Sequence, residues 1–210
     1  MVTRMAREKA CFGLGCFWHV EALFGSQRGV LTTKVGYSGG TTKGPTYQSI
    51  GDHVEVVELV YDDSIISYEK LLNIFWRNHD PTAKPYKRQY ISAIYYHSEL
   101  QKSLAEKTMK EDQVNHGRPI VTEIAAAGPF YDAENYHQKY QLRCNPSLLK
   151  TLGLNDEALK LSEIAAKLNG YVCGMKNLTE FNEESKDLSL TDKQRNYVIE
   201  KIKSGVKAHC

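Results

Sequence analysis

Two periods of hydrophobic residues along the chain predict its strands and helices. Short apolar runs and apolar–polar alternation predict strands at 9–14, 29–37, 54–61, 90–97 and 119–126. Apolar residues three or four positions apart predict helices that begin at Phe17 and after Ser67, and others at 98–116, 132–143, 155–168 and from Thr191. In the first helix, Glu21 is expected on the face opposite the apolar stripe.

The order of these elements predicts the fold class. Strands and helices follow one another as β-α-β-β-α-β-α-β-α, which is typical of an α+β domain with both neighbouring and crossover connections. We expect a two-layer, ferredoxin-like sandwich with a mixed sheet at residues 1–150. Residues 151–210 are expected to form a helical and coil extension that packs on the same domain.

Composition and charge exclude several classes of protein. Hydrophobic residues make up 41% of the 210 positions and charged residues 25%, as in ordinary globular proteins. The 27 Lys and Arg residues barely exceed the 25 Asp and Glu residues and form no run of five, so we expect no nucleic-acid partner.

The N-terminal segment and the cysteines bear on the compartment. An apolar run at 10–18 follows three basic residues, but it contains two glycines and is much shorter than the roughly 20 residues of a membrane helix. We therefore expect neither a secretory signal nor a membrane segment. The five cysteines are widely spaced and odd in number, which favours a reducing, cytoplasmic setting over a disulfide scaffold.

The most informative segment is Gly15-Cys16-Phe17-Trp18, where a strand is expected to pass into a helix. A thiol at the start of a helix faces unpaired N–H groups and the positive end of the helix dipole, which favours the nucleophilic thiolate. Cys16 is therefore a candidate nucleophile, whereas Cys11 and Cys144 are expected to be structural or idle. Cys16 and His19 are spaced like half of a metal site, but no second pair completes it, so we expect no metal.

Several further motifs occur in order along residues 9–143. They are Gly36-Tyr37-Ser38-Gly39-Gly40, Pro45-Thr46-Tyr47, His53-Val54-Glu55-Val56-Val57, His79-Asp80-Pro81-Thr82, Gln89-Tyr90 and Ala133-Glu134-Asn135-Tyr136-His137-Gln138. Together with the segment around Cys16, these motifs resemble the A-type peptide methionine sulfoxide reductases. The sequence departs from the family pattern at Pro85, where the family has an Asp that holds a water molecule.

The resemblance implies a role for each of six residues. Cys16 would be the nucleophile that attacks the sulfoxide sulfur, and Glu55 the acid that protonates the sulfoxide oxygen. Tyr47 and Tyr90 would donate hydrogen bonds to that oxygen. Phe17 and Trp18 would form the wall that holds the methyl group of the substrate. The acid role suits a buried carboxyl, because burial keeps it partly neutral near pH 7. From the residues alone, Glu55 reads as a solvated charge on a strand.

The resemblance also implies a recycling step. Attack leaves Cys16 as a sulfenic acid, which condenses with a second thiol to a disulfide that a reductant then opens. Cys173 and Cys210 are the candidate resolving thiols, and either one or a relay from Cys173 to Cys210 is open. We favour the relay with Cys173 first, because its Asn169-Gly170-Tyr171 context resembles the family segment with a recycling Cys, and because Gly170 and Gly174 would give its backbone the freedom to reach Cys16.

The leading hypothesis is a thioredoxin-dependent reductase of the S epimer of methionine sulfoxide, free or in oxidised proteins. It needs no cofactor and is expected to act as a monomer. Two alternatives from other classes remain open. One is a module that binds methionine sulfoxide or senses peroxide without turnover, and the other is a hydrolase that uses Cys16 with His137 as its base.

Overall fold

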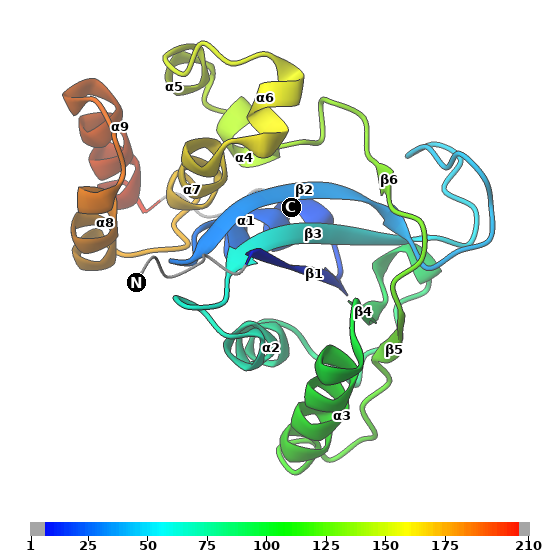
Figure 1. Ribbon diagram of the computed structural model, residues 1–210. Helices are drawn as coiled ribbons and strands as arrows, with labels where there is room; N and C mark the ends of the chain where they lie inside the picture. The colour runs from blue at the N-terminus through cyan, green and yellow to red at the C-terminus, as the bar shows by residue number, and fades with distance from the viewer. Residues whose placement is uncertain (1–6, 206–210) are drawn as a thin grey trace.

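A six-stranded mixed sheet organises the chain. The computed structural model describes residues 7–205, and within them the strands pair in the order β5-β4-β1-β3-β2-β6 (Figure 1). The strands are β1 (Arg7–Leu14), β2 (Val30–Ser38), β3 (Val54–Asp62), β4 (Ser92–Tyr96), β5 (Glu123–Ala126) and β6 (Tyr131–Asp132). Only the β4–β5 pair among the described strands is parallel, so the mixed sheet is confirmed.

The centre of the sheet has the expected ferredoxin-like topology. Strands β1 to β4, with α1 (Phe17–Gly25) and α2 (Tyr68–Arg77), follow the order β-α-β-β-α-β. Their order in space, β4-β1-β3-β2, is antiparallel throughout. Both helices bury their apolar stripes on one face of the sheet, where Phe12 of β1 packs against Phe24 of α1 at 5.0 Å and Phe75 of α2 at 5.5 Å between ring centroids.

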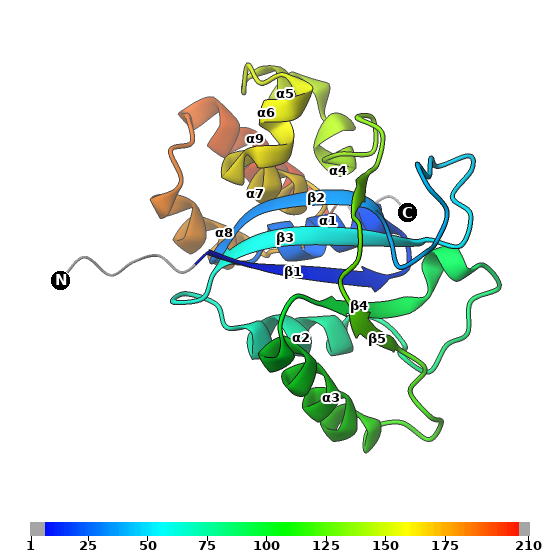
Figure 2. The same ribbon diagram turned by 45° about the vertical axis from the view of Figure 1, so that its right-hand side comes forward.

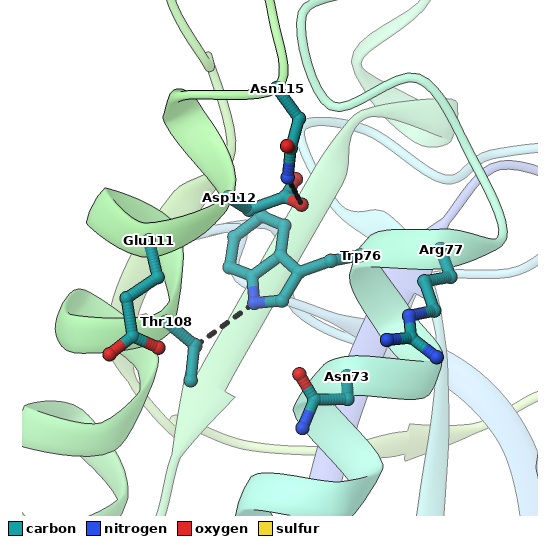
Figure 3. A pocket seen from close by; sticks show the side chains of 7 residues that line it. All are labelled: Asn73, Trp76, Arg77, Thr108, Glu111, Asp112 and Asn115. Atoms are coloured by element: carbon teal, nitrogen blue, oxygen red, sulfur yellow. Dashed lines mark hydrogen bonds between the residues drawn. The ribbon is translucent and has the colours of Figure 1, made fainter.

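A third helix, α3 (Glu99–Gln113), packs beside α2 at the β4 end of this layer. The helix begins where expected, with the Ser98 hydroxyl accepting from Gln101 N–H at 3.2 Å. It packs against α2, and Figure 3 shows Trp76 Nε1 of α2 donating to Thr108 Oγ1 of α3 at 2.9 Å. The polar cleft of about 170 Å³ beside this bond contains none of the residues expected in the active site.

The last third of the chain is a helical region on the β2 side of the sheet (Figures 1 and 2). Its helices are α4 (Tyr140–Arg143), α5 (Pro146–Lys150), α6 (Asp156–Leu161), α7 (Glu163–Tyr171), α8 (Leu178–Glu184) and α9 (Asp192–Lys203). They share an apolar cluster of their own, and α7 lies directly against α1. The contact requires Gly170, because a Cβ there would lie 2.5 Å from the Ala22 carbonyl oxygen.

Three local expectations were wrong. The helix expected at 132–143 is reduced to α4, because the segment before it is irregular and Lys139 has a left-handed φ of 56°. The helix expected at 155–168 is two helices, since Ser162 ends α6 in an extended conformation and caps α7. Glu21 is not on a solvent face: it is 0% exposed, and its carboxylate binds the Lys139 ammonium.

None of the helices within residues 7–205 combines the length and the hydrophobicity needed to cross a membrane.

Candidate active site

Cys16 lies at the junction between β1 and α1. Gly15 makes the turn possible with a φ of 98°, a value that only glycine adopts readily. Cys16 is then the residue that caps the helix, and its carbonyl accepts the His19 N–H at 3.2 Å. The half-buried Cys16 side chain is therefore at the N-terminal end of α1, as the sequence predicts.

Glu55 is buried next to Cys16. It is the second residue of β3 and only 1% exposed, so it is not a solvated strand charge. Its Oε2 accepts the backbone N–H of Phe17 at 3.1 Å, and its Oε1 accepts from Gln89 Nε2 at 2.5 Å. Burial raises the pKa of the Glu55 carboxyl, and these two hydrogen bonds offset the rise only in part. Glu55 thus retains its proton to a higher pH than an ordinary carboxyl group.

Two tyrosines complete this group of side chains. Tyr90, in the short 3-10 helix η1 (Arg88–Tyr90), is half-buried, and Tyr47 is 37% exposed in the loop between β2 and β3. Burial raises the pKa of Tyr90, and Glu55, a hydrogen bond with the Tyr47 side chain and Cys16 raise it further. The structure therefore brings Cys16, Tyr47, Glu55 and Tyr90 together from four different elements: the start of α1, the β2–β3 loop, β3 and η1.

Phe17 and Trp18 form a fixed aromatic wall beside these groups. Phe17 is 1% exposed and packs against His137 at 5.1 Å between ring centroids. Trp18 stacks flat on Tyr140, with centroids 3.7 Å apart and planes at 7°. Its indole Nε1 also donates to His137 Nδ1 at 3.0 Å, so the Trp18 ring is held on its face and at its edge.

The hydrogen bonding of His137 argues against the alternative of a hydrolase that uses this residue as the base for Cys16. Its Nδ1 accepts the Trp18 bond, and burial lowers the pKa of the ring, so the neutral imidazole carries its proton on Nε2. Within residues 7–205 this Nε2 has no hydrogen-bond partner, and the nearest carboxylate oxygen, on Glu134, is 3.8 Å away. The only lone pair with which His137 could take a proton from Cys16 is therefore occupied by Trp18.

The loop that carries Tyr47 is held by several polar anchors. The Asp52 carboxylate accepts the backbone N–H groups of Thr41 and Thr42 at 2.8 to 3.1 Å, and these bonds hold its pKa well below the usual range. Glu134 accepts the Tyr47 N–H at 2.9 Å. Tyr47 is thus positioned by its backbone, although its side chain reaches solvent.

Arg88 is a further anchor that the sequence did not indicate. Its guanidinium donates to the Asp52 carbonyl at 2.8 Å, to the Gly39 carbonyl at 3.2 Å and to the Glu123 carboxylate at 2.8 and 3.1 Å. One side chain thereby ties the β2–β3 loop and β5 to the helix that carries Tyr90. Its position directly before Gln89-Tyr90 is the only signal that could have pointed to it.

The structure describes one of the two expected resolving cysteines, Cys173. Cys173 follows α7, is 4% exposed, and its Sγ lies 3.2 Å from the Gly170 carbonyl oxygen. Gly170 does not provide the backbone freedom expected of it, because it serves the close contact of α7 with α1. Cys210 lies outside the described residues.

Comparison with known proteins identifies the family. A family model described as peptide methionine sulfoxide reductase matches residues 8–168. The chain belongs to the peptide methionine sulfoxide reductase A family. A second model, described as the helical domain of selenoprotein methionine sulfoxide reductase A, matches residues 153–203 and so covers α6 to α9.

Relatives of this reductase family align over most of the chain. A peptide methionine sulfoxide reductase of Drosophila melanogaster is 45% identical over 195 residues, which are 92% of this chain and 79% of that protein. Reduced Mxr1 of Saccharomyces cerevisiae has a TM-score of 0.62 at 30% identity and covers 67% of this chain and 86% of its own. Mxr1 in complex with Trx2 has a TM-score of 0.50 at 28% identity, and the match covers 62% of this chain and 84% of the Mxr1 chain. The family, the enzyme class and the fold expected from the sequence are confirmed.

Proposed function

We propose that this reductase acts on the S epimer of methionine sulfoxide, free or in proteins, with Cys16 as the nucleophile and Glu55 as the acid. The observation that carries the proposal is the buried Glu55 carboxyl, bound to the N–H of Phe17 one residue from Cys16. A sulfoxide oxygen leaves poorly until it is protonated. A carboxyl whose pKa burial has raised is therefore suited to supply that proton near pH 7.

The first half-reaction transfers the oxygen to the enzyme. The Cys16 thiolate attacks the sulfoxide sulfur, Glu55 gives its proton to the oxygen, and Tyr47 and Tyr90 donate hydrogen bonds to that oxygen. The attack joins the Cys16 sulfur to the substrate sulfur, and the sulfur–oxygen bond breaks as the protonated oxygen leaves as hydroxide. The hydroxide adds to the Cys16 sulfur and the sulfur–sulfur bond breaks, so the methionine sulfur gains two electrons and Cys16 loses them to become a sulfenic acid. Phe17 and Trp18 hold the substrate methyl group, a role that the fixed orientation of the Trp18 ring supports.

The second half-reaction restores the thiol. The Cys173 thiol displaces water from the sulfenic acid and forms a disulfide with Cys16, which Cys210 takes over and a thioredoxin dithiol finally reduces. Helix α7 packs on α1, but the close approach is at Ala22 and Ser26, at the end of α1 away from Cys16. The support for Cys173 as the first partner is its Asn169-Gly170-Tyr171 context, which resembles the family segment with a recycling Cys. The yeast Mxr1 complex with Trx2 supports thioredoxin as the reductant.

The test is turnover with a dithiol and each epimer of N-acetyl methionine sulfoxide. We expect methionine from the S epimer alone, since each reductase type handles one epimer, and none from Cys16→Ser, whose hydroxyl lacks thiolate reactivity. Binding of the sulfoxide without turnover would instead identify a binding or sensing module. Turnover of the R epimer, or turnover by Cys16→Ser, would contradict the proposed mechanism.

A further inference from the structure

A groove of about 260 Å³ adjoins the active site at Gly15 and Tyr90, and neither Phe17 nor Trp18 lines it. It begins at Gly15 and Tyr90, which flank Cys16 and Glu55, and extends along the segment that follows α2. The residues that line it are Leu14, Gly15, His79, Asp80, Ala83, Lys84, Pro85, Tyr90 and Ser92. A volume of this size admits one amino-acid side chain from a peptide whose methionine sulfoxide occupies the site.

Two ionisable residues of the groove, His79 and Asp80, present no uncompensated charge. The Asp80 carboxylate is bound by the Thr82 hydroxyl at 2.6 Å and by Arg118 at 2.9 Å, so its charge is already compensated. Burial lowers the pKa of His79, which leaves this ring neutral near pH 7. Neither residue presents an unbalanced charge to a ligand in the groove.

The unbalanced charge at the groove is positive. Lys84 lines it and Lys87 follows in the same short loop, and both side chains are exposed. Neither lysine has an ion-pair partner in the part of the chain that the structure describes. Arg88, the next residue, is committed to Glu123 and to two carbonyl oxygens. The apolar walls from Leu14, Ala83 and Pro85 and the Lys84 side chain match an aliphatic stem that ends in a carboxylate, and Lys87, three residues further along the loop, adds positive charge close to the groove.

We infer that this groove receives a residue next to methionine sulfoxide in a polypeptide, and that Lys84 and Lys87 make the enzyme prefer glutamate there. The inference rests on the proposed function, because it assigns a substrate class to the same site. Exposed ion pairs are weak and screened by salt. The preference is therefore a modest one that disappears at high ionic strength.

The experiment compares three capped five-residue peptides with a central S-epimer methionine sulfoxide, flanked on both sides by Glu, Gln or Lys. With dithiothreitol as the reductant, kcat/KM should fall in the order Glu, Gln, Lys, with roughly a two- to tenfold range at low salt. The range should vanish near 1 M salt, where the screening length is about 3 Å. The Lys84→Gln/Lys87→Gln variant should turn over all three peptides alike, and the uncharged N-acetyl methionine sulfoxide methylamide as fast as the unaltered chain does.

The matched control removes two charges elsewhere. Lys186 and Lys193 are also exposed, and lie near α8 and α9, at the other end of the molecule from the loop that carries Tyr47 (Figure 1). The Lys186→Gln/Lys193→Gln variant should keep the full peptide preference. Equal kcat/KM for the three peptides, or a preference that survives in Lys84→Gln/Lys87→Gln, would overturn the inference. So would an effect of that variant seen only when thioredoxin replaces dithiothreitol. Absence of turnover with every sulfoxide would instead refute the proposed function.

Discussion

Removing the charge of Glu21 should destabilise the protein far more than removing that of an exposed carboxylate. The side chains of Glu21 and Lys139 are both 0% exposed, with Nζ to Oε1 at 2.7 Å. The carboxylate also accepts the Lys139 backbone N–H at 2.7 Å and the Thr33 hydroxyl at 3.1 Å. Glu21→Gln keeps the size of the side chain but leaves the buried ammonium without a counter-charge.

The expected loss follows from that burial. Breaking a buried ion pair on one side costs about 3–5 kcal/mol, because an uncompensated charge stays in a low-dielectric interior. For a chain of this length each kcal/mol lowers Tm by about 2–4 °C, so Glu21→Gln should lower Tm by roughly 6–20 °C. Replacing both partners, as Glu21→Gln/Lys139→Met, should cost less than Glu21→Gln alone, because no charge is then left buried.

Thermal unfolding followed by circular dichroism measures these differences. The matched control is Glu69→Gln, which breaks the Glu69–Lys107 pair of similar length, 2.9 Å, at side chains that are 44% and 56% exposed. An exposed pair contributes at most about 1 kcal/mol, so the control should change Tm by a few degrees at most. The reasoning fails if Glu21→Gln and Glu69→Gln have equal effects, or if the double variant is less stable than Glu21→Gln.

Two other predictions concern the chemistry. Glu55→Ala should lower kcat/KM about 100- to 10,000-fold at neutral pH and recover in part as the pH falls, and a fast variant would remove Glu55 from the acid role. Glu55→Gln should be more stable than the unaltered chain above the ordinary carboxyl pKa, with a gain that fades below it. Between the ordinary carboxyl pKa and the raised pKa of Glu55, the folded state binds more protons than the unfolded state. The stability of the unaltered chain therefore falls as the pH rises from the first pKa to the second. Cys173→Ser should release one methionine per chain and then stall with thioredoxin while small thiols sustain turnover; a stall seen only in Cys210→Ser would make Cys210 the direct resolver.

Strands β1 to β5 and the first helices could be predicted because their signals are local, although β5 begins at Glu123 and not at 119, and the two-residue strand β6 was not predicted. Alternation and capping residues such as Ser67 and Ser98 lie within the elements that they define. The irregular segment before α4 could not be predicted from the sequence, because long-range hydrogen bonds override its helical composition. The Gln138 side chain binds the backbone N–H and carbonyl of Val35, and the Lys139 N–H binds Glu21. These contacts hold the chain out of a helix and leave Lys139 at positive φ.

The same distinction applies to the site. Cys16 and Glu55 lie in motifs that the sequence displays, so their roles could be anticipated from a resemblance. The roles of Arg88 and of Glu134, although Glu134 also lies in a displayed motif, could not, because each acts on a loop far away in sequence: Arg88 on Asp52, 36 positions earlier, and Glu134 on Tyr47, 87 positions earlier. Their charges look like ordinary surface charges until the fold supplies the partners.

The chemistry and the substrate preference depend on groups in opposite environments. A helix N-terminus and the Gln89 amide both favour the Glu55 carboxylate, yet its pKa is raised, so burial is the dominant effect on this group. A group controlled by burial is insensitive to charges that solvent screens. Lys84 and Lys87 are exposed, and so they influence how a charged peptide approaches and docks but not the proton of Glu55. Substitution of the two lysines should therefore change kcat/KM for charged peptides and leave the pH profile of turnover in place. Substitutions that let water reach Glu55 should move the pH profile for every substrate alike.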